Sequence, residues 1–265
     1  MSKEFILNSL VMQSALYDLP DEKARQKSVI ELANLFANII TNSKVDSFFE
    51  IGALNAEFSM FIKDQVKNVV AFEASPRNFD QAKDAISNIE YLNMAVSDHN
   101  GEIDINVAIS TKSGTRSINI GADSILSKIN DEDTIYKKNK VECTKLDTFI
   151  ANKKWENQSN ALWIDVEGSS LNVLVGAEDS LKNTKAIFIE VEQATFWENQ
   201  ALVGEINKFL CDRNFVPIAR DFEYENQYNV IYISEDILYS SAVDISLQMF
   251  YAGMATKGSQ YVQKI

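Results

Sequence analysis

Residues 48–57 read FFEIGALNAE, and residues 69–73 read VVAFE. Each stretch is an apolar run that reaches a carboxylate, and Glu73 lies 21 residues after Gly52. This spacing is typical of a βαβ unit that binds a nucleoside: a glycine turn follows the first strand, and an acid after the second strand accepts hydrogen bonds from the ribose hydroxyls. We therefore expect an adenosine-containing cofactor, with Glu73 on its ribose.

Expected strands and helices alternate along the rest of the chain. Apolar runs predict strands at 46–51, 69–73, 91–95, 161–165 and 186–191, and helical periodicity predicts helices at 55–66, 77–88, 169–182 and 202–213. Such alternation favours an α/β fold with a doubly wound, mostly parallel sheet. The last two runs, 215–219 and 230–233, have no helix between them and predict an antiparallel C-terminal hairpin. This is the Rossmann-like layout of class I methyltransferases.

We expect three parts: an N-terminal helical extension at 1–45, a methyltransferase domain at 46–234 and a C-terminal helical tail at 235–265. Within the second part, Asn100-Gly101 predicts a tight hairpin between 95–96 and 103–105. The polar stretch 110–117 is expected to be a loop, and 146–150 a short helical turn.

Composition narrows the class of protein. The formal charge of −13 disfavours nucleic acid as a partner, because such a surface repels phosphate backbones. The two cysteines have no paired spacing, so a zinc site is not expected. No apolar run approaches the ~18 residues of a membrane helix, and the N-terminus lacks the apolar core of a signal peptide. We expect a cytoplasmic protein that acts on a small molecule or a glycan, with a homo-oligomer left open as an alternative to a monomer.

The turn at 52–57 discriminates between cofactors. A dinucleotide site needs several glycines so that backbone can approach the pyrophosphate, and this turn has Gly52 alone. It also places Glu57 near the helix start, where a carboxylate repels phosphate. S-adenosylmethionine has no phosphate and carries a positive sulfonium, so the turn favours it.

Acidic residues stand at four expected strand ends: Glu50, Glu73, Asp165, and Glu190 or Glu192. Like charges placed together repel unless a cation or a set of hydroxyls lies among them. Asp165 could position an acceptor hydroxyl or take its proton, or it could cap the helix at 169–182. A divalent ion held by Asp165 and Glu192 is an alternative, but we expect no metal. Phe196-Trp197 could stack on a sugar or bury apolar area, and Arg116 could bind an anionic acceptor.

With these residues in hand, the chain resembles the FkbM family of S-adenosylmethionine-dependent methyltransferases. The resemblance runs from about Phe48 to Ile233 and is strongest in Asp165-Val166-Glu167-Gly168, followed by Gly176-Ala177. Supporting matches are 71–76 (AFEASP), 93–98 (NMAVSD) and 146–148 (LDT). The family's first motif is Asp-x-Gly-Ala-Asn-x-Gly, whereas this chain has Glu50, Leu54 and Ala56 at the Asp, Asn and second Gly.

The resemblance implies O-methylation of a hydroxyl on a sugar, glycan or natural product. It implies cofactor-binding roles for Glu50, Gly52, Ala53, Asn55, Glu73, Ala74, Asn93 and Asp165, and catalytic roles for Asp165, Glu167 and Glu192. Two alternatives stay open at this point. One is a non-catalytic cofactor-binding or regulatory protein with a decayed site, suggested by the altered 50–57 turn; the other is a dinucleotide-dependent oxidoreductase.

Overall fold

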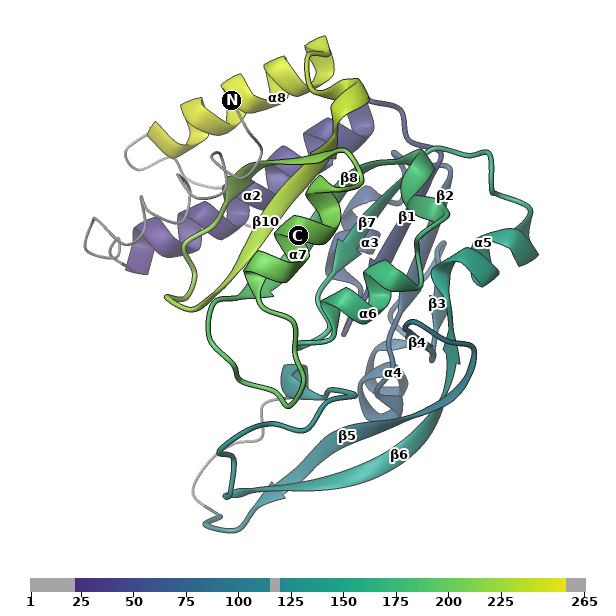
Figure 1. Ribbon diagram of the computed structural model, residues 1–265, viewed down its shortest axis with the longest axis vertical. Coiled ribbons are helices and arrows are strands. Elements are labelled where there is room, and N and C mark those ends of the chain that lie inside the picture. The colour runs from purple at the N-terminus through teal and green to yellow at the C-terminus, as the bar shows by residue number, and fades with distance from the viewer. Residues whose placement is uncertain (1–21, 115–119, 256–265) are drawn as a thin grey trace.

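A seven-stranded sheet forms the centre of the molecule in a computed structural model that describes residues 22–114 and 120–255 (Figure 1). Its order is β3-β2-β1-β7-β8-β10-β9, and only β10 runs antiparallel to its neighbours. The strands are β1 Ser47–Ile51, β2 Asn68–Phe72, β3 Glu90–Leu92, β7 Asn160–Ile164, β8 Thr184–Glu192, β9 Phe215–Arg220 and β10 Gln227–Ser234. The predicted α/β class I methyltransferase fold, with its C-terminal hairpin, is confirmed.

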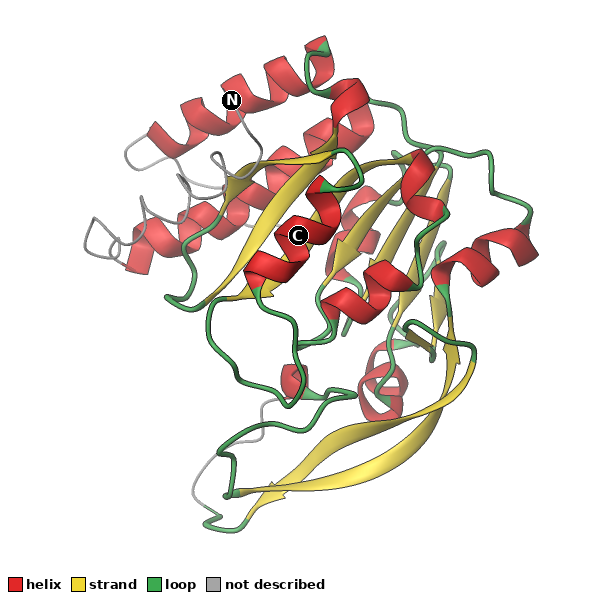
Figure 2. Cartoon of the chain, in the orientation of Figure 1, coloured by secondary structure: helices red, strands yellow, loops and turns green. Residues whose placement is uncertain are grey.

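Helices cover both faces of this sheet (Figure 2). Alternation along β8 sends Phe188 toward one apolar core and Ile187 and Ile189 toward the other, as a strand buried on both faces requires. The first core includes α2 Glu22–Asn42, α3 Glu57–Ile62 and α8 Ser241–Ala255, and the second includes α5 Leu146–Lys153, α6 Ser170–Val175 and α7 Val203–Cys211.

The helices near the predicted site are shorter than the sequence suggested. The helix expected at 77–88 ends early as α4 Pro76–Ala82, and the one expected at 169–182 divides into α6 and the 3₁₀ turn η2 Ser180–Asn183. The division falls at Gly176, where a Cβ atom would lie 2.0 Å from the Ser97 carbonyl oxygen. This close approach of two backbones explains the glycine and ends the helix there.

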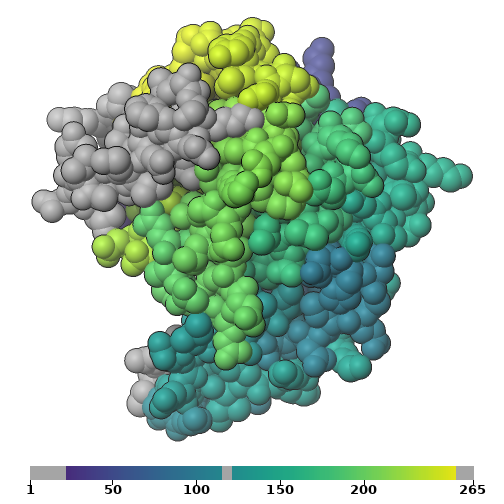
Figure 3. Space-filling model, in the orientation of Figure 1, coloured from purple at the N-terminus to yellow at the C-terminus, as the bar shows by residue number. Residues whose placement is uncertain are grey.

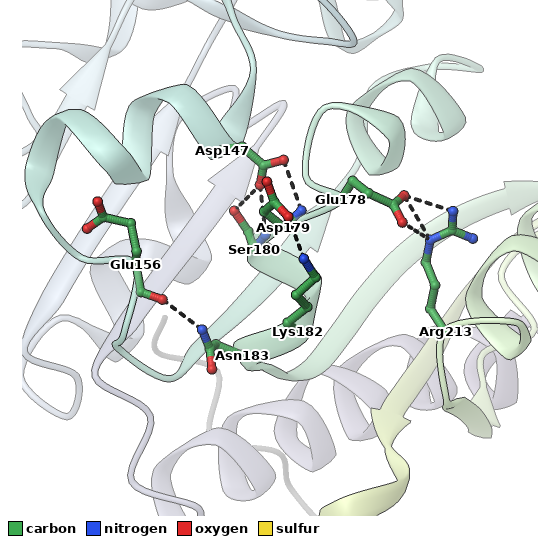
Figure 4. A network of polar contacts seen from close by, with 8 residues as sticks. All are labelled: Asp147, Glu156, Glu178, Asp179, Ser180, Lys182, Asn183 and Arg213. Carbon is green, nitrogen blue, oxygen red and sulfur yellow. Dashed lines mark hydrogen bonds and ion pairs between the residues drawn. The ribbon is translucent and has the colours of Figure 1, made fainter.

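Asp147 holds the segment that follows the break. Its carboxylate accepts hydrogen bonds from the backbone amides of Asp179 and Ser180, at 3.0 and 2.7 Å, and from the Ser180 hydroxyl (Figure 4). Arg213, which lies between α7 and β9, forms an ion pair with Glu178 at 2.8 Å, and the same view shows this pair. The Leu-Asp-Thr match at 146–148 therefore has a structural reason, because Asp147 ties α5 to η2.

A second sheet, of order β4-β6-β5, was not predicted. Its strands are β4 Ala95–Val96, β5 Gly101–Thr111 and β6 Thr134–Thr144. The last two form the long two-stranded ribbon at the lower end of Figure 1, and the blue and teal atoms at the lower end of Figure 3 belong to this part of the chain. The predicted hairpin between 95–96 and 103–105 is wrong, since β4 pairs with β6 in parallel. Asn100 instead binds the start of α5, accepting from the Lys145 amide at 2.9 Å and donating to Thr148 at 3.0 Å.

The terminal helices pack together on the sheet. The apolar stripe expected before residue 45 is buried in α2, where Leu32, Phe36 and Ile40 are fully buried, and α8 lies along α2. Residues 1–21 and 256–265 lie outside the described part, so the domain limits stay a prediction. Among the described helices, none combines the length and apolar character needed to cross a bilayer.

Candidate active site

A cavity of about 700 Å³ opens at the carboxyl ends of β1, β2, β7 and β8. This is where ligands bind in open α/β sheets. Its lining includes Gly52, Glu73, Ala74, Asp165, Glu167 and Glu190, together with residues of the β5–β6 and β9–β10 connections, Asp123, Ser124, Glu223 and Tyr224. None of its described lining residues is a Lys, Arg or His, so the cavity is acidic.

The turn after β1 depends on Gly52. Its φ is +83°, and a Cβ atom there would lie 1.7 Å from the Asp165 carbonyl oxygen, so no other residue fits. Leu54 and Ala56 also have left-handed backbone, with φ of 48° and 54°. Asparagine and glycine, which the family motif has at these two positions, adopt left-handed backbone readily. Leucine and alanine disfavour it, yet the turn keeps this conformation.

Glu73 links the loops that follow β1 and β2 at one end of the cavity. Its carboxylate accepts from the Leu54 amide after β1 and from the Ser75 amide after β2, both at 2.7 Å. Burial raises the pKa of Glu73 to about 7, although these amides oppose the shift. An ionised carboxylate has about four acceptor sites, so it can still accept from ribose hydroxyls.

Four of the residues predicted to bind the cofactor do not line the cavity. Glu50 is buried and accepts from the Ser59 amide, at 2.8 Å, in the first turn of α3; burial raises its pKa to about 7. Asn55 is exposed and donates to Glu57, while the Ala53 amide donates to the Phe72 carbonyl. Asn93 donates to the carbonyls of Glu73 and Ala74, at 2.8 and 3.2 Å. These residues shape the loops that carry Gly52, Glu73 and Ala74.

The predicted catalytic carboxylates gather at the ends of β7 and β8. Asp165 and Glu167 line the cavity, and Glu192 is buried beside them with 2% of its surface exposed. Burial raises the pKa of Asp165 to about 6, of Glu167 to about 8 and of Glu192 to about 7, and the Asp165 charge adds to the latter two shifts. These values suit groups that exchange protons near neutral pH.

The helix-capping alternative for Asp165 is not supported by the geometry. The residue that precedes α6 is Ser169, and no side chain caps that end of the helix. Within the described residues, no group of three His, Cys, Asp or Glu side chains is arranged to hold a metal ion. The expectation that no metal takes part stays a prediction.

Trp197 has a structural role. It is 1% exposed, and its ring packs on Gly168, where a Cβ atom would come within 2.5 Å of it. It is therefore not available to stack on a sugar. Arg116, the suggested anion-binding residue, lies outside the described residues.

Sequence reasoning missed the loop residues that close the cavity. Asp123 is held by an ion pair with Arg77, at 2.8 Å, and by the Ala108 amide, at 3.0 Å. Glu223 and Tyr224 belong to the polar stretch between β9 and β10. In the sequence, Asp123 and the pair Glu223 and Tyr224 belong to polar loops. A polar composition does not indicate which part of the fold a loop will contact.

The comparison with protein families decides the class. The model of the methyltransferase FkbM domain matches residues 34–217. The chain belongs to the FkbM methyltransferase family. The predicted class, an S-adenosylmethionine-dependent methyltransferase, is thereby confirmed at the level of the family, and a dinucleotide-dependent oxidoreductase is excluded. A search of curated proteins found no match.

Solved structures with a similar arrangement are also methyltransferases. They include the 1,6-didemethyltoxoflavin-N1-methyltransferase of Burkholderia thailandensis with S-adenosylhomocysteine, at 10% identity over 88% of this chain and 86% of that one, TM-score 0.39. The N-methyltransferase NodS of Bradyrhizobium japonicum has 11% identity over 81% and 98%, TM-score 0.42. The magnesium protoporphyrin IX methyltransferase of Synechocystis, with S-adenosylmethionine, has 8% identity over 88% and 98%, TM-score 0.40.

Proposed function

We propose that this protein transfers a methyl group from S-adenosylmethionine to a hydroxyl of a sugar, glycan or natural-product acceptor. The observation that supports it is one continuous cavity, about 700 Å³, that joins Glu73 at the end of β2 with Asp165 and Glu167 after β7. A nucleoside-binding acid and a group of proton-accepting carboxylates thus face the same space.

The residues of the cavity fit this cofactor. Glu73 would bind the ribose hydroxyls, while Gly52 and Ala74 let backbone approach the adenosine. The lining carboxylates attract a sulfonium and repel a pyrophosphate, which also argues for this cofactor over a dinucleotide. When bound, S-adenosylmethionine supplies an electrophilic methyl group.

The remaining chemistry is proton removal from the acceptor. An alcohol oxygen gains the methyl group and must lose its proton, and we assign that proton to Asp165. The charge of Asp165 raises the pKa of Glu167 and of Glu192, so these neighbours hold their protons more tightly than Asp165, which is the carboxylate left ionised to accept the proton. A carboxylate with a raised pKa is a stronger base than an exposed one, so this burial aids the transfer.

Calorimetry of the full chain tests the proposal. S-adenosylhomocysteine should bind with one site per chain, and NAD should not bind. Binding of NAD alone would refute the cofactor assignment. Methyl transfer from S-adenosylmethionine to amines or thiols, with hydroxyl compounds unreactive, would refute the acceptor assignment.

A further inference from the structure

Leu54, in the turn after β1, has a backbone conformation that its side chain disfavours. Its φ is 48°, in the left-handed region, and the residue lines the cavity. Left-handed backbone brings the Cβ atom of an ordinary residue too close to a carbonyl oxygen. Such strain persists only where the surrounding structure fixes the backbone, so the peptide groups on both sides of Leu54 should be held in place.

Both of these peptide groups have a hydrogen-bond partner. The Leu54 amide donates to the Oε2 atom of Glu73, at 2.7 Å, and the Leu54 carbonyl accepts from the hydroxyl of Tyr91. Glu73 comes directly after β2, and Tyr91 lies in β3, which is the next strand of the sheet. Side chains from two neighbouring strands therefore hold the turn after β1.

Small side chains let Tyr91 reach this turn across the sheet. Tyr91 is paired with Ala71 of β2, and β2 lies between β3 and β1. The ring packs against the buried cluster of Ala53, Ala56 and Ala71. Phe79 of α4 stacks on the ring of Tyr91, with the ring centroids 4.9 Å apart. Because alanine projects only a methyl group from the sheet, the ring can pass over β2 and bring its hydroxyl to the turn.

The Tyr91 hydroxyl remains a donor across the neutral pH range. Burial raises the pKa of Tyr91 above its ordinary value, and the charges of Glu73 and Glu50 add to this shift. The hydroxyl therefore keeps its proton, and a carbonyl oxygen can only accept. The hydrogen bond to Leu54 is consequently present at any pH near neutrality.

We propose that Tyr91 is a positioning residue for the cofactor, because its hydroxyl holds Leu54 in the left-handed conformation that keeps the Leu54 amide on Glu73. This inference rests on the proposed function and adds a residue to its cofactor site. Tyr91 does not itself line the cavity, so it acts through the turn and not by contact with the cofactor.

The consequence for binding follows from Glu73. Without the Tyr91 hydroxyl, Leu54 would relax toward a more common conformation and turn its amide away. The Glu73 carboxylate would then lose one of the amides that orient it toward the ribose. A site that must be ordered when the ligand arrives binds more weakly than one that is already ordered. Removal of the hydroxyl should therefore lower the affinity for the cofactor.

Calorimetry of the full chain with S-adenosylhomocysteine tests the inference. Tyr91→Phe removes only the hydroxyl and keeps the ring that stacks on Phe79. It should weaken S-adenosylhomocysteine by about ten-fold, which corresponds to about 1.4 kcal/mol. Tyr136→Phe is the matched control, because it removes a hydroxyl that donates to Asp131, at 2.6 Å, outside the cavity. The control should change the affinity by less than about two-fold.

A second background separates the positioning role from a general loss of stability. Asparagine adopts left-handed backbone readily, so the turn in Leu54→Asn does not depend on the Tyr91 hydroxyl. In that background Tyr91→Phe should weaken S-adenosylhomocysteine by less than about three-fold. A purely structural role of the hydroxyl would give the same loss in both backgrounds. Thermal melts of all variants exclude unfolding.

Three results would overturn the inference: unchanged affinity in Tyr91→Phe, equal losses in Tyr91→Phe and Tyr136→Phe, or the same loss from Tyr91→Phe with and without Leu54→Asn. Failure of the parent protein to bind S-adenosylhomocysteine would instead refute the proposed function. Binding to the parent is measured first, so the two failures are distinguished.

Discussion

Glu50 stands at the acidic position of the family's first motif. Its acid could serve the packing of the fold or the binding of the cofactor, and the two roles predict different results. Its carboxylate is 5% exposed, accepts from the Ser59 amide and does not line the cavity. Burial raises its pKa from 4.5 to about 7. The folded protein therefore holds a proton that the unfolded chain releases as pH rises from about 4.5, and stability falls across the window up to about pH 7.

The magnitude follows from this shift. One pKa unit corresponds to about 1.36 kcal/mol, so between pH 5.5 and pH 8 Glu50 alone lowers the free energy of unfolding by about 2 kcal/mol. Glu50→Gln resembles the protonated acid, and its amide oxygen can still accept from Ser59. The free energy of unfolding of the variant should exceed that of the parent at both pH values, and the excess should grow by about 2 kcal/mol from pH 5.5 to pH 8, or roughly 4–8 °C in melting temperature.

Thermal melts at the two pH values measure this difference. Glu57→Gln is the matched control, because it removes one carboxylate from an exposed position at the start of α3. The control should shift stability by less than about 0.5 kcal/mol. Parallel pH curves for parent and Glu50→Gln would refute the reasoning. Calorimetry with S-adenosylhomocysteine should give affinities within three-fold, and a loss beyond ten-fold would return Glu50 to the cofactor site.

Four other outcomes are expected. Ala56→Gly should stabilise the protein by about 0.5–1 kcal/mol in denaturant unfolding, because it relieves a left-handed alanine, whereas Ala151→Gly on the exposed side of α5 should destabilise it by a similar amount; equal losses would contradict the strain. Glu73→Ala should weaken S-adenosylmethionine by about 10–100-fold in calorimetry, with melts to exclude unfolding, and unchanged affinity would move the ribose elsewhere. Asp165→Asn should keep cofactor affinity within a few-fold and slow methyl transfer by on the order of 10²-fold, and normal turnover would send the search for the base to Glu167 or Glu192. A chelator should have little effect on activity, and loss with rescue by magnesium would show that a metal takes part.

The parallel sheet was predictable because it is buried on both sides. Strands such as β2 and β8 then read as continuous apolar runs, and helices between them show one apolar stripe. The second sheet escaped notice because β6 is largely exposed and carries Lys137, Lys138 and Lys140. Its pairing with β4 joins residues 48 positions apart, Ala95 with Cys143 and Val96 with Thr144, which no local pattern records.

Helix ends were less predictable because backbone conformation decided them. The helix expected from residue 55 begins at Glu57, after the left-handed Leu54 and Ala56, neither of which signals such a conformation by its type. The break at Gly176 depends on the Ser97 carbonyl, which approaches from the turn that follows β4. In both places the deciding contact is tertiary.

The residues of the candidate site also divide into those that the sequence predicts and those that only the tertiary structure reveals. Gly52, Glu73 and Asp165 stand at the carboxyl ends of adjacent parallel strands, so their types and spacing were enough to bring them to one edge. The choice between Glu190 and Glu192 could not be made from sequence, because both lie on one face of β8, which runs to residue 192 instead of 191. The structure brings Glu190 to the cavity and buries Glu192 behind it.

The antiparallel hairpin adds polar and acidic side chains to one end of this cavity. β10 pairs with β8 opposite both acids, Asn229 facing Glu190 and Gln227 facing Glu192, and its connection to β9 adds Glu223 and Tyr224 to the lining. In the proposed function the nucleoside would contact only the ends of β1, β2 and β7, which a dinucleotide-binding domain would also have. Acceptor preference should therefore change with substitutions in residues 221–229 and at Glu190, while cofactor affinity should change with substitutions at Gly52 and Glu73. Because separate strands carry the two sets, the two properties can vary independently in this fold.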